Sequence, residues 1–404
     1  MTRRAALPLL LSRVAGRLFA GDWPQFRGPD GQGHSDAKAL PLTWSETENV
    51  RWKIPIPGRG WSSPAILKDR IWLTAAVGRD PSLRAICFDR ESGKEQQNVE
   101  LFRVSGGEHL NVKNSFATPT PVLEDDRVYL HFGPYGTACI RTSGDIVWKT
   151  RLRYTPEHGP GGSPALFEDL LIISCDGQDV QYIVALDKVT GKARWKTSRA
   201  GYQAYTTPLV IEAAGRAQLI SPGARRAMSY DPRTGREIWA VRYGDGFSNV
   251  PRPVFGAGLI FICTGFFEPS VLAVRPDGKG DVTNTHIAWA LRRGAPLTPS
   301  PICVGEELFV VNDNGIVTCL DAASGTEWWR ARLNGNYSAS PVSAEGRIYF
   351  LNEEGETTVI TAGRQFQKLA ANRLNGATLA SIAISHGAIF IRAEQSLYRV
   401  ELGK

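Results

Sequence analysis

The sequence predicts an all-β chain, folded as an eight-bladed β-propeller of four-stranded antiparallel blades. Gly (41 residues) and Pro (25 residues) together exceed their usual share of about 12% in this chain of 404 residues, so sharp turns are frequent. A unit of about 43 residues recurs eight times, which is the period of four-stranded propeller blades. A strand that precedes the first unit also matches the strand that the last unit lacks.

Each unit begins with Ser-Pro or a similar pair and continues as three short apolar strands separated by turns. In the clearest copy we expect strands at residues 170–174, 182–187 and 193–197, because these segments are rich in β-branched residues and bounded by turn residues. Proline cannot donate to a strand ladder, so it suits the first strand of a blade, at the edge beside the channel. The residues that mark this position are Pro64, Pro121, Pro164, Pro208, Pro253, Pro301, Pro341 and, in the eighth unit, Ile382.

The end of each unit predicts a tight hairpin and an aromatic contact between blades. In Asp187-x-x-Thr190-Gly191-Lys192, we expect the glycine to supply the positive φ of a turn. Trp195 follows four residues later and is expected to pack against the neighbouring blade. Six tryptophans are assigned to this position, which Gln97 and Gln367 occupy in two degenerate units: Trp52, Trp148, Trp195, Trp239, Trp289 and Trp329.

The two ends of the repeat region predict how the ring closes. The last unit stops at residues 397–402 without a tryptophan strand, whereas residues 50–55 form such a strand with no unit of their own. We expect residues 50–55 to complete the last blade, which removes the open edges of the sheet. One domain over residues 21–404 therefore replaces the two or three domains that the chain length suggests, and we expect a monomer.

Charge and the N-terminal segment bear on location and partners. The net charge is +7, but Lys and Arg are scattered, so no nucleic-acid-binding arm is predicted, and no apolar run is long enough for a membrane helix. Residues 1–20 combine Arg3 and Arg4, an apolar stretch and a final Ala20, which is typical of an export signal, the twin-arginine kind included. A non-cleaved arm or a misplaced start codon is the alternative. Periplasmic or secreted location is thus expected, with the cytoplasm as the alternative.

No catalytic machinery or metal site is predicted from local motifs. The six cysteines lack metal-type spacing and align with small buried positions, although a disulfide remains open. The six histidines have no ligand spacing, and no Gly-x-Ser-x-Gly elbow occurs. Residues 312–315 (Asn-Asp-Asn-Gly) are expected to form a hairpin turn instead of a calcium loop. Residues 159–162 are expected to connect two blades instead of cradling a phosphate.

The phrase Ala185-x-Asp187-x-x-Thr190-Gly191-Lys192-x-x-Trp195 resembles the pyrroloquinoline-quinone (PQQ)-type repeat of bacterial eight-bladed propellers. Residues 23–29 and 58–64 are also similar to exported propellers of this kind. The family includes quinoprotein dehydrogenases and a non-catalytic outer-membrane assembly lipoprotein. The resemblance implies a binding or scaffold propeller of the envelope or, as the alternative, a dehydrogenase that oxidises alcohols or sugars with PQQ and Ca²⁺. This chain lacks an adjacent cysteine pair, a local calcium motif and any cysteine before Cys87, so we favour a non-catalytic role without the lipid anchor.

The loops that lead into the inner strands are the candidate binding site. They vary from unit to unit and should gather at one mouth of the channel, where a ligand or a protein partner is expected. Aromatic and amide groups there suit a planar or sugar-like ligand or, equally, a protein contact, and plain turn residues are the third alternative. The side chains of Trp61, Tyr202 and Tyr337 are expected to be exposed. The candidate residues are Arg59, Trp61, Asn114, His158, Tyr202, Tyr205, Asn249, Arg293, Asn336 and Tyr337.

Overall fold

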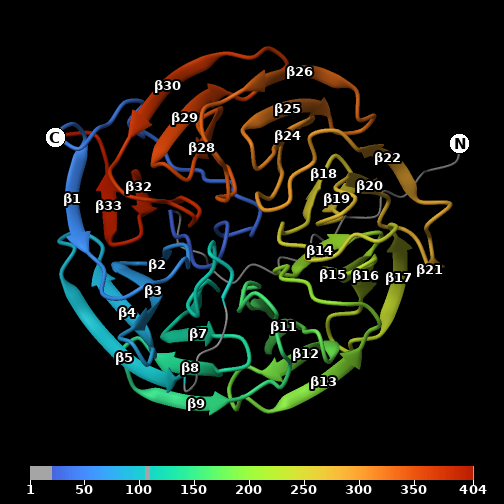
Figure 1. Cartoon of the computed structure of the whole chain (residues 1–404), viewed down its shortest axis with the longest axis horizontal. Coiled ribbons are helices and arrows are strands. Elements are labelled where there is room, and N and C mark those ends of the chain that lie inside the picture. Colours follow the sequence, from blue (N-terminus) through green and yellow to red (C-terminus); the bar gives the residue numbers. More distant parts are fainter. Residues whose placement is uncertain (1–20, 105–109, 404) are drawn as a thin grey trace, which may run out of the picture.

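The computed structural model describes residues 21–104 and 110–403, and the regular elements in these residues are all strands, arranged as eight sheets around a central channel (Figure 1). The prediction of an eight-bladed, all-β propeller is confirmed. The predicted export signal at residues 1–20 lies outside the described residues. No described helix has the length and apolarity to cross a membrane.

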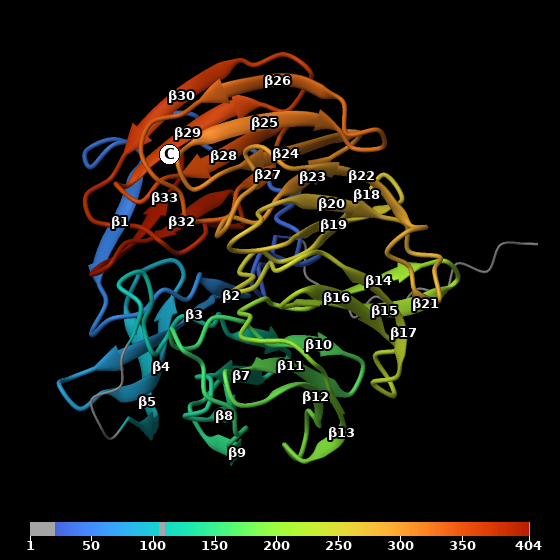
Figure 2. The same cartoon turned by 45° about the vertical axis from the view of Figure 1, so that its right-hand side comes forward.

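Each blade runs from an inner strand beside the channel to an outer strand, with antiparallel neighbours (Figures 1 and 2). Blades 1 and 2 contain β2 (Ala65–Leu67), β3 (Arg70–Val77), β4 (Ser82–Asp89), β5 (Glu95–Arg103), then β6 (Val122–Glu124), β7 (Arg127–His131), β8 (Thr137–Arg141) and β9 (Ile146–Thr150). Blades 3 and 4 contain β10 (Ala165–Phe167), β11 (Leu170–Asp176), β12 (Gln181–Asp187), β13 (Ala193–Ser198), then β14 (Leu209–Ala213), β15 (Arg216–Gly223), β16 (Arg226–Tyr230) and β17 (Glu237–Arg242).

The second half of the ring repeats this order. Blades 5 and 6 contain β18 (Val254–Gly256), β19 (Leu259–Cys263), β20 (Val271–Val274), β22 (Ile287–Leu291), then β23 (Ile302–Val304), β24 (Glu307–Val311), β25 (Ile316–Asp321) and β26 (Glu327–Arg332). Blades 7 and 8 contain β27 (Val342–Ala344), β28 (Arg347–Leu351), β29 (Glu356–Thr361), β30 (Lys368–Arg373), then β31 (Ala383–Ser385), β32 (Ala388–Arg392), β33 (Ser396–Val400) and β1 (Val50–Pro55). The long loop of blade 5 adds β21 (Gly280–Asp281) outside β17.

Strand β1 closes the ring as the sequence predicts. It pairs antiparallel with β33, with Lys53 opposite Tyr398 and Ile54 opposite Leu397. Figure 1 shows the blue β1 on the outer side of the red β33. The first and last parts of the described chain therefore share one sheet, and the ring has no open edge there.

A ring of hydrogen bonds joins the inner strands around the channel. The residue that precedes each blade's proline, or Ile382 in blade 8, donates its backbone N–H to the hydroxyl of the equivalent residue in the next blade, at 2.9–3.0 Å. Seven links are present, and the eighth is broken because Arg252 stands where a hydroxyl is needed. The members are Ser63, Thr120, Ser163, Thr207, Arg252, Ser300, Ser340 and Ser381.

The tryptophan position is an interface between blades, as predicted. The indole N–H of Trp148 donates to the Lys188 carbonyl of the next blade at 3.1 Å, and a Cβ at Gly191 of that blade would collide with the same ring. Gly191 has a φ of +72°, so the turn and the ring contact both favour glycine. The indoles of Trp52, Trp195, Trp289 and Trp329 make the same contact, whereas that of Trp239 donates to Gln218 of its own blade.

One assignment to the tryptophan position is wrong. In other blades, the interface tryptophan or Gln97 pairs with a residue of the third strand, and that residue directly precedes a β-bulge. In blade 7 that register pairs Val359 with Ala370, so Ala370 occupies the position and Gln367 does not. The connection from β29 to β30, residues 362–367, is one residue longer than its counterparts in blades 1, 3 and 6, which shifts the position along the sequence. The six cysteines are buried and free, so the small-residue prediction is confirmed.

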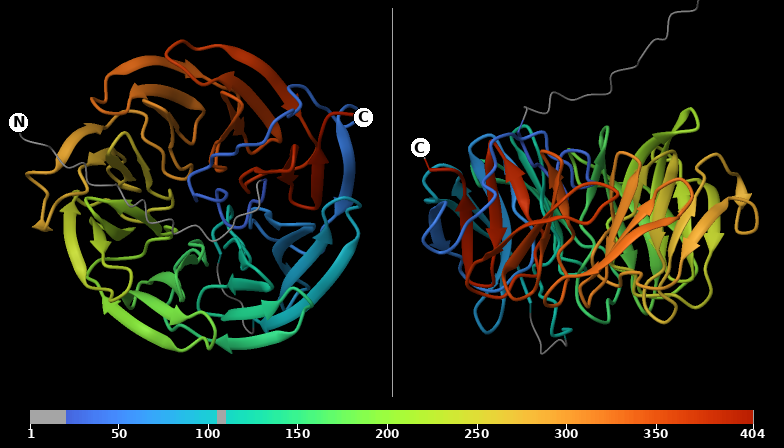
Figure 3. Two further views of the ribbon diagram at one scale, coloured as in Figure 1. Left: turned by 180° about the vertical axis from the view of Figure 1, so that it is seen from behind. Right: turned by 90° about the horizontal axis from the view of Figure 1, so that it is seen from above.

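Residues 22–44, here called the N-terminal strap, cross one end of the channel. Figure 3 (left) shows this dark-blue segment running over the middle of the ring. The strap binds the inner strands: Trp23 exchanges backbone hydrogen bonds with Ile66 of β2, and the Gly33 carbonyl accepts from Ser343 of β27. The Arg252 side chain accepts no bond in the hydroxyl ring, and its guanidinium donates to the carbonyls of Phe26 and Pro208 at 2.8 and 3.0 Å. The strap therefore closes one end of the channel, which we call the lower mouth. The opposite end, where the loops into the inner strands gather, is open and is called the upper mouth.

Candidate functional site

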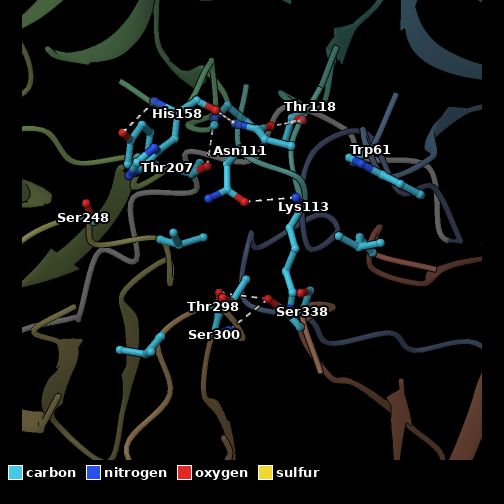
Figure 4. A pocket seen from close by; sticks show the side chains of 18 of the residues that line it. Trp61, Asn111, Lys113, Thr118, His158, Thr207, Ser248, Thr298, Ser300 and Ser338 are labelled. Carbon is cyan, nitrogen blue, oxygen red and sulfur yellow. Dashed lines mark hydrogen bonds between the residues drawn. The ribbon is translucent and has the colours of Figure 1, made fainter. Parts of the chain in front are cut away.

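A cavity of about 670 Å³ occupies the upper part of the channel (Figure 4). Its walls come from the loops that lead into the inner strands, as the sequence predicts, and Phe26 of the strap contributes to its inner end. Members of the hydroxyl ring line it, together with further hydroxyl groups. These are Ser63, Thr120, Ser163, Thr207, Ser300, Ser340, Ser381, Thr118, Ser248, Thr298 and Ser338. The cavity is thus a blind, hydroxyl-lined pocket with one open mouth.

In the connection from blade 1 to blade 2, residues 110–121 contribute Asn111, Lys113, Asn114, Thr118 and Thr120 to the cavity wall. Within it, the Asn114 amide donates to the His158 carbonyl at 2.7 Å and fixes the loop to the next blade. The backbone N–H of His158 in turn donates to the Tyr205 hydroxyl at 3.3 Å, and the two rings lie 5.9 Å apart. Asn114, His158 and Tyr205 therefore form one continuous wall across blades 2, 3 and 4.

The charged groups at the mouth are already engaged. Lys113 reaches across the opening to Glu353, whose carboxylate lies 2.7 Å from the ammonium nitrogen and also accepts from Ser338 at 2.6 Å. On the opposite side, the Gln203 side-chain amide donates to the Glu157 carboxylate. Burial raises the pKa of the Tyr205 hydroxyl, so the group stays protonated at neutral pH. The wall therefore presents mostly neutral donors and acceptors.

Four aromatic rings form a surface beside the cavity, and only one of them, Tyr202, is among the predicted site residues. We call Tyr202, Phe247, Phe266 and Phe267 the aromatic ledge; successive ring centroids lie 5.1–5.9 Å apart. Three of them (Tyr202, Phe247 and Phe266) line the cavity. The sequence feature that could have predicted the ledge is the Phe-Phe pair between Gly265 and Pro269. Such a segment is expected to form a turn and therefore to lie on the surface.

The structure brings five of the ten predicted residues to the cavity wall. These are Trp61, Asn114, His158, Tyr202 and Tyr205. Arg59, Asn336 and Arg293 are exposed and do not line the cavity; Arg59 donates to the Val112 carbonyl and Asn336 contacts Glu354. Whether any of the ten binds a ligand or partner stays a prediction.

Asn249 and Tyr337 are buried between strands instead of facing the cavity. The Asn249 amide donates to the Tyr243 hydroxyl and the Cys263 carbonyl, so it supports the linker that carries part of the wall. Tyr337 is completely buried in the core cluster between blades 6 and 7. The expectation that Tyr337 is exposed is wrong, because its side chain turns into the interface. The same expectation is wrong for Trp61, which is buried with only 6% exposure, although part of its ring lines the cavity.

Two buried arginines, Arg27 and Arg252, lie where the strap meets the ring. Burial and the neighbouring guanidinium of Arg252 lower the pKa of Arg27 to about 9, and burial lowers that of Arg252 to about 10. Both therefore remain charged at neutral pH. Arg27 donates to the Gln32 carbonyl, and both side chains fold against strap glycines, where a Cβ at Gly31 or Gly33 would collide with them. These contacts hold the strap in place.

The described residues do not fit a calcium-bound quinone. Calcium takes six to eight oxygen ligands, usually including several carboxylates. Glu157 is the one carboxylate among the described lining residues, and it is bonded to Gln203. Within residues 21–104 and 110–403, no group of three or more His, Cys, Asp or Glu side chains is placed to hold a metal ion.

The family model described as outer membrane protein assembly factor BamB matches residues 137–242 and 224–378, which together span more than half of the chain. The chain belongs to this family. The predicted resemblance to PQQ-type repeat propellers is confirmed. The matched residues include all four members of the aromatic ledge.

Solved structures share the fold at low sequence identity. BamB from Moraxella catarrhalis is 13% identical, with a TM-score of 0.62 over 86% of this chain and 98% of that chain. Quinohemoprotein alcohol dehydrogenase from Comamonas testosteroni is 10% identical, with a TM-score of 0.69 over 95% of this chain and 81% of that chain. Both likenesses concern the fold alone.

A relative with a curated description matches a shorter segment. Serine/threonine-protein kinase AfsK of Streptomyces griseus is 33% identical over 122 residues, which are 29% of this chain and 15% of that protein. The match spans about one seventh of that kinase's length.

Proposed function

We propose that this chain is a non-catalytic binding propeller that holds a protein partner or a ligand at its upper mouth. The observation that carries the proposal is the blind cavity of about 670 Å³, whose walls are hydroxyls, amides and aromatic rings. Such walls provide contact area and orienting hydrogen bonds, which is what binding requires. The charged groups are engaged in hydrogen bonds, since Lys113 pairs with Glu353 and the Glu157 carboxylate accepts from the Gln203 amide. A general acid or base would need a side chain left available for substrate.

The same proposal places the chain in the bacterial cell envelope. Residues 1–20 have the order of an export signal, and the name of the matching family refers to outer membrane protein assembly. A rigid ring with variable loops at one face suits a scaffold, because loops can change without disturbing the blades. We therefore propose an exported scaffold that captures its partner through the upper mouth.

A photo-crosslinking experiment tests this function. A photoreactive phenylalanine analogue replaces Tyr202 at the cavity wall or, as the control, Trp328, which is 39% exposed on outer strand β26. We expect the Tyr202 position to capture a discrete partner or ligand from envelope extract and the Trp328 position to capture none. Equal capture at both positions, or at neither, would contradict a binding site at the mouth.

A second measurement addresses the dehydrogenase alternative. Purified protein is supplied with PQQ and Ca²⁺, and dye reduction is followed with alcohols and sugars. We expect no turnover above the buffer control, since the described cavity residues lack a calcium ligand set. Sustained dye reduction that depends on both additives would show that the chain is an enzyme.

A further inference from the structure

Exposed aromatic side chains concentrate at one sector of the upper mouth. On the aromatic ledge, Phe267 is 69%, Phe266 51% and Tyr202 41% exposed, while Phe247 packs between them. Exposed phenylalanines gain nothing for the stability of an isolated chain, and clusters of this kind mark contact surfaces. The ledge is also continuous with the cavity, because three of its four rings line the cavity wall.

The turn that carries Phe266 and Phe267 is rigid and strained. The N–H of Phe266 donates to the Phe247 carbonyl at 2.7 Å, and the Thr264 hydroxyl ties the two ends of the turn through Glu268 and Ser270. Phe267 has a φ of +77°, a left-handed conformation that is an outlier for a bulky residue. Such strain tends to persist at functional sites, where the structure around it holds it in place.

The charges beside the ledge are acidic, although the whole chain is basic. Glu157 lies at the cavity wall, and Glu268 directly follows Phe267 on the exposed turn. Among the described residues neither carboxylate has a Lys or Arg within ion-pair distance. Asp245, on the neighbouring linker, is exposed and pairs with Arg225 at 3.4 Å. A cation brought by a partner would meet an aromatic face and two carboxylates that lack a cationic partner, although Glu157 accepts from the neutral Gln203 amide.

We propose that the aromatic ledge docks an extended segment of a partner protein in which an aromatic side chain is flanked by Lys or Arg. The proposal rests on the proposed binding function and specifies its partner chemistry. The aromatic side chain packs against Phe266 and Phe267, and the flanking cations face Glu157 and Glu268. Rigid aromatic anchors at the edge of a pocket are typical of interface hot spots, because little order is lost on binding.

The experiment selects peptides from a phage-displayed random nonapeptide library on the full chain and counter-selects on the variant Phe267→Gly. Glycine adopts a φ of +77° without strain, and this relief offsets the greater entropy of the unfolded chain, so the variant should melt close to the parent while it loses the contact surface. Phe366→Ala is the matched control, since Phe366 is an exposed phenylalanine beside Trp329, away from the mouth.

We expect the selected peptides to share an aromatic residue next to Lys or Arg and to bind Phe267→Gly at least tenfold more weakly, with Phe366→Ala unchanged. Peptides without that pattern, no enrichment at all, or equal binding by Phe267→Gly would overturn the docking proposal. Cellotriose is tested in parallel as a probe for a sugar-like ligand. Binding of cellotriose without binding of any peptide would also overturn the docking proposal and would indicate a ligand site at the mouth. A mouth that captures nothing at the Tyr202 position would remove both proposals.

Discussion

The ring of hydrogen bonds around the channel predicts a stability difference between two buried serines of blade 8. The Ser381 hydroxyl accepts the backbone N–H of Ser340 at 2.9 Å, whereas the buried hydroxyl of Ser385 has no hydrogen-bond partner among residues 21–104 and 110–403. Ser381→Ala leaves the Ser340 N–H unsatisfied, which costs about 1–3 kcal/mol. Ser385→Ala removes an unpartnered hydroxyl and should be neutral or slightly stabilising. Both changes delete the same atom, so the contributions of volume cancel.

Urea unfolding followed by tryptophan fluorescence measures this difference. We expect the unfolding midpoint of Ser381→Ala to fall below that of Ser385→Ala by an amount that corresponds to about 1–3 kcal/mol. The slope of the transition must stay the same in both variants, so that the midpoints can be compared directly. Equal midpoints would refute the idea that the ring of inner hydrogen bonds stabilises the propeller.

Three further predictions follow from the strap, the cysteines and the tryptophan interface. Burial lowers the pKa of His34, but the hydrogen bond to Asp30, the charge of Asp30 and the Cys303 carbonyl together outweigh burial and raise the pKa. The pair therefore stabilises the fold below about pH 6.5 and loses this effect as pH rises through the raised pKa, so His34→Gln should cost more stability at about pH 5.5 than at about pH 8.5. Burial raises the pKa of all six thiols, so Ellman's reagent should label none in the native chain and six in urea. Trp329→Ala should cost about 3 kcal/mol, and Trp328→Ala, on the solvent side, well under about 1 kcal/mol in thermal unfolding. Rapid native labelling, a pH-independent effect of His34→Gln, or equal losses at the two tryptophans would contradict these accounts.

The fold was predictable because each unit repeats the same local physical constraints. Proline marks the inner strand in seven blades, glycine the positive-φ turn, and tryptophan the contact with the next blade in six, so the same weak signals recur around the ring. Gln367 shows the limit of such an alignment. The count from Gly363 places it in the tryptophan position, but the strand register selects Ala370. Register depends on pairing between strands, which residue spacing alone does not determine.

The site was predictable only in part because position along a loop does not set side-chain direction. Asn249 and Tyr337 lie in the expected loops but turn into the blade interfaces. Phe266 and Phe267 of the ledge were missed for a different reason. Strand direction alternates within a blade, so the turn between the second and third strands lies at the same mouth as the loops into the inner strands. The turn that carries Phe266 and Phe267 joins the second and third strands of its blade. All ten candidate residues, in contrast, come from the loops that lead into the inner strands.

Hydrogen–deuterium exchange of the chain alone and with its captured partner tests the central claim most directly. If the upper mouth binds the partner, protection should rise at residues 110–118, 201–206, 247–250 and 264–268, which line the cavity or carry the ledge. The strap at residues 22–44 and the outer strands β13 and β26 should exchange as in the free chain. Protection confined to the strap or to the outer strands would contradict a binding site at the upper mouth.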